Sequence, residues 1–98
     1  MTRPAFVYLL HSVKTGGYYL GWTTDVSRRL EEHNKGKSVF TKSRGPWELI
    51  GCEVCRDAKT AQQREKMLKQ RPRQFAQLKK RMVTVFRTAS GGPGQVVG

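Results

Sequence analysis

Residues 5–22 read AFVYLLHSVKTGGYYLGW, in which two short segments of aromatic and branched residues flank a Gly-Gly turn. The first segment runs from Ala5 to His11 and the second from Tyr18 to Trp22. Aromatic and β-branched side chains favour strands, and a short break that contains glycine is typical of a hairpin. We therefore expect these residues to form two neighbouring strands of an antiparallel sheet.

Beyond this hairpin the sequence predicts one further strand and three helices. Asp25 is a candidate N-cap for a short amphipathic helix that stops before Gly36, and a strand is expected at about residues 48–54. Asp57 can cap a second helix, and Pro72 stands where a third would begin. The order strand, strand, helix, strand, helix, helix has too few parallel crossovers for a doubly wound sheet. We predict an α+β fold with a three-stranded, largely antiparallel sheet flanked by helices.

The length of 98 residues suits one domain with a modest core. The patterned segments occupy residues 1–87, and residues 88–98, with their glycines and proline, are expected to form a flexible tail. No apolar run approaches the roughly 20 residues of a membrane span, and the run at residues 5–10 is short for a secretory signal. We expect a cytoplasmic protein that does not bind membranes, and the sequence leaves the oligomeric state open.

The charge of the chain points to a polyanionic partner. Nineteen Lys and Arg residues against seven Asp and Glu residues give a formal net charge of +12. A small domain this basic gains free energy by releasing counterions from nucleic-acid phosphates. The alternative is a solvated basic surface with no specific partner.

Cys52 and Cys55 form a C-x-x-C motif, which in other settings indicates zinc or redox chemistry. A structural zinc ion needs four ligands, and the two histidines of the chain do not have finger spacing. The surrounding residues read as a strand, so side chains three apart point to opposite faces. We expect two reduced thiols.

Two triplets of the hairpin, Phe6-Val7-Tyr8 and Tyr19-Leu20-Gly21, open a longer pattern. It continues through Gly21-x-Thr23-Thr24-Asp25-x-x-x-Arg29-Leu30-x-x-His33-Asn34-x-Gly36, then Thr41-x-x-Arg44-x-Pro46-Trp47 and Ala61-x-x-x-Glu65. The pattern resembles the GIY-YIG nuclease family, and it looks most similar to the small stand-alone bacterial branch of YhbQ-like, UPF0213-type proteins. Phe6 and Val7 replace Gly and Ile of the family triplet, and Leu20 replaces Ile. Several relatives have a small or basic residue after the second triplet, where this chain has Trp22, so no catalytic lysine carries over there.

The resemblance implies a nuclease that uses one divalent ion, Mg²⁺ or Mn²⁺. The matching functional positions are Tyr8, Tyr19, Arg29, His33 and Glu65. Glu65 would hold the metal, and Arg29 would bind the scissile phosphate. Tyr8 would orient or deprotonate the attacking water, which requires nearby positive charge to lower its pKa. Tyr19 and His33 would position the phosphate and relay protons.

The residues themselves agree with these roles but leave alternatives open. Arg29 and His33 are four residues apart, so they share one helical face. Glu65 falls on the stripe of its helix that should be buried, where a carboxylate needs a cation such as a metal ion or Arg29. The two tyrosines could instead be core residues, and Glu65 could form a surface ion pair with Arg64 or Lys69.

A binding surface for nucleic acid is also predicted. Its candidate residues are Trp22, Lys35, Lys37, Lys42, Arg44 and Lys69. Trp22 and Trp47 could stack on unpaired bases or could be buried against the sheet.

The primary hypothesis is a metal-dependent endonuclease that cleaves DNA, in preference to RNA, with low sequence specificity. The first alternative is a nucleic-acid-binding or accessory module with little or no catalysis, for example in DNA repair. The second is a ribosome-associated basic protein that prefers RNA.

Overall fold

The computed structural model describes residues 3–89, which form a three-stranded antiparallel sheet with three helices. The elements are β1 (Ala5–Ser12), β2 (Tyr18–Thr23), α1 (Val26–Asn34), β3 (Trp47–Cys55), α2 (Ala58–Gln70) and α3 (Pro72–Ala89). Asp25 and Asp57 cap α1 and α2 through their side chains, and Pro72 is the first residue of α3. The predicted fold class and the order of its elements are confirmed.

β1 lies at the centre of the sheet, in the order β2-β1-β3. It is antiparallel to both neighbours, with Tyr8 directly opposite Gly21 on β2 and opposite Cys52 on β3. The pairing with β3 shifts register between Leu9 and Leu10, which oppose Gly51 and Leu49. Tyr8 therefore lies between Gly21 on one edge strand and Cys52 on the other.

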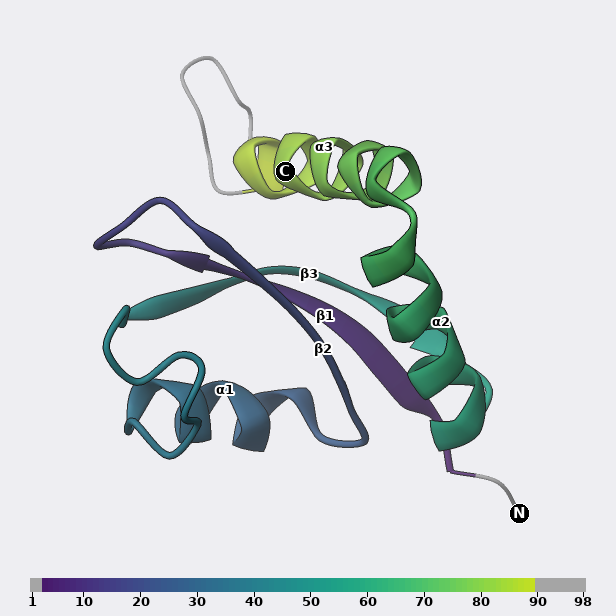
Figure 1. Ribbon diagram of the computed structural model, residues 1–98, viewed down its shortest axis with the longest axis horizontal. Helices are drawn as coiled ribbons and strands as arrows, with labels where there is room; N and C mark the ends of the chain where they lie inside the picture. Colours follow the sequence, from purple (N-terminus) through teal and green to yellow (C-terminus); the bar gives the residue numbers. More distant parts are fainter. Residues whose placement is uncertain (1–2, 90–98) are drawn as a thin grey trace.

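Two hydrophobic clusters fill the two faces of the sheet. Val7 and Leu9 of β1 pack with residues of α2 and α3, whereas Tyr8 and Leu10 pack on the other face with Leu30 of α1. This division follows from the alternation of side chains along a strand. Figure 1 shows α1 on one side of the sheet and α3 on the other, with α2 beside the ends of the strands. Tyr8 thus belongs to the smaller cluster, next to α1.

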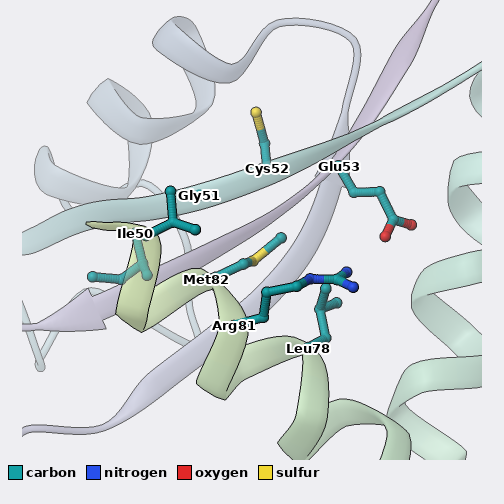
Figure 2. Close-up of a pocket in the computed structure, with 8 residues that line it drawn as sticks. Ile50, Gly51, Cys52, Glu53, Leu78, Arg81 and Met82 are labelled. Atoms are coloured by element: carbon teal, nitrogen blue, oxygen red, sulfur yellow. The ribbon is translucent and has the colours of Figure 1, made fainter. Parts of the chain in front are cut away.

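The face of β3 toward α3 carries a shallow cavity of about 260 Å³, lined largely by apolar side chains that include Ile50, Leu78 and Met82. Figure 2 shows that Cys52 points to the side of β3 away from Met82. Cys52 is exposed, Cys55 is buried in the larger cluster, and both are free thiols. The prediction of two unpaired thiols on opposite faces of a strand is confirmed.

Two predictions concern the ends of the described region. α3 continues to Ala89, so the first two residues of the predicted tail are helical. The rest of that tail, residues 90–98, lies outside the described residues. Among the helices within residues 3–89, none is both long and apolar enough to cross a membrane.

Candidate active site

A chain of buried hydrogen bonds links β1, α1 and the loop before β3. The hydroxyl of Tyr8 lies 2.9 Å from Nε2 of His33, and Nδ1 of His33 lies 2.7 Å from Oγ1 of Thr41. The exposed fractions of Tyr8, His33 and Thr41 are 2%, 1% and 0%. Both imidazole nitrogens are therefore occupied, and the ring has one fixed orientation.

The imidazole of His33 is held in its neutral form. Burial lowers its pKa to about 4, and the positive charge of Arg29 contributes in the same direction. A neutral imidazole has one donor and one acceptor. The Arg29 guanidinium, which can only donate, interacts with the Tyr8 hydroxyl oxygen. We therefore assign the Tyr8 proton to the bond with Nε2, and Nδ1–H donates to Thr41.

The depressed pKa of His33 makes stability depend on pH. Between the unfolded value of 6.5 and the folded value of about 4, the unfolded chain binds more protons than the native protein. The stabilisation is complete above pH 6.5 and is lost as the pH falls toward 4. We expect the free energy of unfolding to drop by roughly 2 kcal/mol more in the wild type than in His33→Gln between pH 7 and 4.5, measured by urea denaturation. Identical pH profiles for the two proteins would contradict this assignment.

Tyr8 has a higher pKa than an ordinary tyrosine. Burial raises it to about 12, and the charges of Tyr19 and Glu65 add to this, while Arg29 opposes it. The expectation that nearby positive charge lowers the pKa of Tyr8 is wrong as a net effect, because desolvation outweighs the guanidinium. The hydroxyl therefore remains protonated at neutral pH and donates to His33.

Arg29 lies on the same face of α1 as His33, as its spacing predicts. Its guanidinium pairs with Glu32 at 3.0 Å and is about one-third exposed. Burial lowers the pKa of Arg29, but its interactions with Glu32 and Tyr8 outweigh that effect, so the net shift of the pKa is upward. Arg29 therefore remains a cation, and part of its side chain is exposed to solvent.

Tyr19 connects this cluster to α2. Its ring centroid lies 4.9 Å from that of His33 and 6.3 Å from that of Tyr8. Nζ of Lys69 lies 5.8 Å from the Tyr19 ring centroid and 3.0 Å from a carboxylate oxygen of Glu65. The five predicted site residues are thus brought to one region of the molecule, with Lys69 bound to the acid.

The ion pair of Glu65 was one of the alternatives that the sequence left open. Glu65 pairs with Lys69, while Arg64 binds Glu53 on β3 and Arg29 binds Glu32. The Glu65 side chain is 19% exposed, so it is neither buried nor fully solvated. Part of the Glu65 side chain is therefore accessible from solvent.

Glu65 is also the candidate ligand for a divalent cation. Within residues 3–89, no group of three or more His, Cys, Asp or Glu side chains is arranged to hold a metal. Mg²⁺ is commonly held by one or two carboxylates, with waters and substrate phosphates completing its coordination. A single partly exposed carboxylate fits an ion of that kind once Lys69 gives up its contact.

The loop that supplies Thr41 is attached to α1 and β3 at defined points. The Asn34 side chain accepts from the backbone N–H of Trp47 at 2.7 Å and donates to its carbonyl oxygen at 3.0 Å. Nε1 of Trp47 donates to the carbonyl oxygen of Thr41 at 2.9 Å. Trp47 is 4% exposed, so the burial alternative is correct for this tryptophan. Trp22 is half-buried against the larger cluster.

The predicted basic residues of this loop are exposed. Lys35 pairs with Glu31 one helical turn earlier. Lys37, Lys42 and Arg44 are exposed along the loop that ends at β3. These cations lie on the segment that supplies Thr41 to the hydrogen-bonded chain.

Three residues of the site had no role in the sequence interpretation, although all belong to the quoted pattern. Thr41 orients His33, and Asn34 ties the loop to β3. A Cβ on Gly21 would lie 2.5 Å from the Tyr8 hydroxyl, so the phenol needs the space above this glycine. A glycine paired across the hairpin from a tyrosine was the available signal, because directly opposed residues share one face.

The chain is similar along most of its length to proteins of one family. Residues 4–81 match the GIY-YIG catalytic domain. Over 72 residues the chain is 40% identical to a UPF0213 protein of Streptococcus agalactiae, covering 72% of this chain and 81% of that protein. It is 38% identical over 74 residues to a UPF0213 protein of Streptococcus pneumoniae, with 74% of each covered. A solution NMR structure of a UPF0213 protein from Bacillus halodurans is 32% identical, with a TM-score of 0.46, and the match covers 78% of this chain and 83% of that one.

Proposed function

Since this chain belongs to the GIY-YIG catalytic domain family, we propose that it is a nuclease that hydrolyses phosphodiester bonds in DNA with one divalent cation. The observation that best supports the proposal is the Tyr8–His33–Thr41 chain beside Arg29. A buried tyrosine hydroxyl needs one hydrogen-bond partner, but Tyr8 has both an oriented neutral imidazole and a guanidinium near its oxygen, which is more than packing requires. A hydrolase needs both a proton acceptor and a cation near the phosphate.

Tyr8 is the proposed proton acceptor for the attacking water. Its pKa of about 12 excludes a resting phenolate at neutral pH. Instead, its oxygen accepts a proton from water as its own proton moves to Nε2 of His33, 2.9 Å away. Because its pKa is about 4, His33 is unprotonated throughout the physiological range and can take this proton, as a weaker base than an ordinary histidine. The hydrogen bond from Nδ1 to Thr41 holds the ring in the orientation that this transfer requires.

Arg29 and Tyr19 are proposed to bind the phosphate. The guanidinium can donate two parallel hydrogen bonds to phosphate oxygens and can stabilise the charge that develops on them. The ring centroid of Tyr19 lies 4.9 Å from that of His33 and 5.8 Å from Nζ of Lys69, and its hydroxyl is the proposed second donor. Glu65 would hold the Mg²⁺ or Mn²⁺ ion, which when bound supplies further neutralisation of the phosphate and a more acidic water.

Low sequence specificity follows from the chemistry of the binding surface. Lys37, Lys42 and Arg44 are exposed cations, and cations of this kind bind phosphates. Phosphate contacts position a nucleic acid but carry no sequence information. DNA is the proposed substrate, and RNA is the comparison that the experiment must include.

A cleavage assay with a matched pair of variants tests the proposal. Glu65→Gln and Glu31→Gln each remove the acid of a Glu–Lys pair four residues apart on a helix. With DNA and RNA in Mg²⁺ or Mn²⁺, we expect Glu65→Gln to lower cleavage at least about 100-fold, whereas Glu31→Gln keeps the wild-type rate. Cleavage by the Glu65 variant at the wild-type rate would show that the activity comes from elsewhere.

A nucleic-acid-binding module without turnover is the second candidate. The contact of Lys69 with Glu65 favours it, because a carboxylate already paired with an ammonium is a weaker metal ligand. Its signature is salt-dependent binding, no cleavage in either metal, and an affinity that Glu65→Gln leaves unchanged.

A further inference from the structure

In one turn of the loop before β3 the polar side chains are buried and the apolar side chains are exposed, which is the reverse of the usual arrangement. Ser38 and Thr41 are 7% and 0% exposed, whereas Val39 and Phe40 between them are 80% and 74% exposed. The backbone N–H groups of Thr41 and Lys42 both donate to the carbonyl oxygen of Ser38, at 3.2 and 3.0 Å. The turn is therefore fixed with its polar residues inside and its apolar residues in water.

This arrangement is not the scattered exposure of single apolar residues that most surfaces show. Val39 and Phe40 are adjacent, and Thr41 cannot rotate outward because its hydroxyl binds His33 and its carbonyl oxygen accepts from Trp47. Neither apolar side chain can turn inward without breaking those bonds. The turn holds an aromatic ring out in solvent, where a partner can cover it.

The surroundings of the ring define the chemistry of that partner. Lys37 and Lys42, which flank Val39 and Phe40 in the sequence, are both exposed. A partner that matches this surface must therefore offer an apolar face with negative charge next to it. A nucleobase with its flanking phosphates has this composition. Phe40 also directly precedes Thr41, and two hydrogen bonds lead from Thr41 through His33 to Tyr8. The flanking cations, and the attachment of this turn to the candidate active site through Thr41, favour nucleic acid over a lipid surface or a protein.

We propose that Phe40 stacks on an unpaired base beside the bound phosphate, with Val39 packing against its edge. The inference rests on the proposed function for the position of the phosphate. In a continuous duplex both faces of each base are covered by its neighbours, so Phe40 gains little contact. A strand with an unpaired base offers a free face, and stacking there is tolerant of base identity. The protein therefore prefers nucleic acid that contains an unpaired base.

The preference can be measured without catalysis. Fluorescence anisotropy in EDTA gives the affinity of the full chain for a duplex with one unpaired base and for the fully paired duplex of the same sequence. We expect the wild type to bind the first about tenfold more tightly and Phe40→Ala to reduce this ratio to near one by weakening that complex alone. Phe40→Trp should retain the ratio, because it keeps an aromatic face.

Two controls separate stacking from other causes. Lys42→Ala should weaken both complexes equally, as expected for a phosphate contact, and Val54→Ala, an exposed apolar residue on β3, should change neither. A ratio unchanged by Phe40→Ala, or a Phe40-dependent change in oligomeric state with unchanged DNA affinity, overturns the proposal. The assay measures binding and needs no cleavage, so it can be interpreted even if the protein is not a nuclease. If the protein cleaves DNA but Phe40→Ala leaves the affinity ratio of the two duplexes unchanged, the stacking proposal alone is wrong.

Discussion

Replacing Tyr8 with phenylalanine is expected to lower the rate of DNA cleavage by about 10³-fold while the protein remains folded. General acid–base groups typically contribute 10²- to 10⁴-fold. The ring of phenylalanine fills the same space in the smaller cluster, so packing with Leu10 and Trp47 is retained. The hydroxyl is lost, and with it the oxygen that connects water to Nε2 of His33 in the proposed mechanism.

The variant should also be slightly less stable, because Nε2 of His33 is left buried without its partner. The cost of one such unsatisfied group is about 1–3 kcal/mol. Tyr18→Phe is the matched control, since Tyr18 lies on the same hairpin, is 37% exposed, and packs against His11 outside the site. Cleavage rates with substrate in excess, together with urea denaturation, distinguish the two effects. Equal rates for Tyr8→Phe and Tyr18→Phe would remove Tyr8 from the mechanism.

The fold could be predicted because its helices and its hairpin are marked by local sequence signals, such as helix N-caps and turn glycines. Asp25 and Asp57 accept from the backbone of the first turn of α1 and α2, as residues of that type do before a helix. The glycine-containing break after β1 turns the chain back, and Gly16 adopts a φ of 78° there. These features act within a few residues of each other, so the sequence alone is enough to place them.

The electrostatics of the site could not be predicted in the same way. The pKa of Tyr8 depends on desolvation by residues distant in the sequence, and the sequence showed only the nearby cation. Likewise, Thr41 lies in the loop eight residues after His33, so no single helix or strand relates the two positions. The candidate site residues followed from the family resemblance of the sequence pattern, but their protonation states required the packing.

Replacing Gly21 with alanine is expected to lower cleavage at least about 100-fold through the position of Tyr8. An added Cβ would lie 2.5 Å from the Tyr8 hydroxyl oxygen, 2.6 Å from its Cζ and 3.0 Å from Cε2 of Tyr19. Gly21 does not have a positive φ, so this position requires the space and not the backbone freedom of glycine. The phenol must move away, and a displacement of about 1 Å from a catalytic position can cost 10²-fold.

Gly51→Ala is the matched control for the effect of adding a methyl group to the sheet. Its Cβ would lie 3.3 Å from Cγ and 3.4 Å from Sδ of Met82, a flexible side chain on the face away from Tyr8. We expect this variant to lose a little stability and to keep its activity, because methionine can adapt.

A double-mutant cycle shows whether the Gly21 effect passes through the phenol. In the Tyr8→Ala background the two closest contacts of the new methyl group are absent and only Cε2 of Tyr19 at 3.0 Å remains, so Gly21→Ala should cost little further free energy of unfolding. In the wild-type background the same change should cost about 1–3 kcal/mol, as overpacking usually does. A coupling energy near zero in urea denaturation would mean that the two positions act independently. In that case Gly21 would not be what holds Tyr8 against His33.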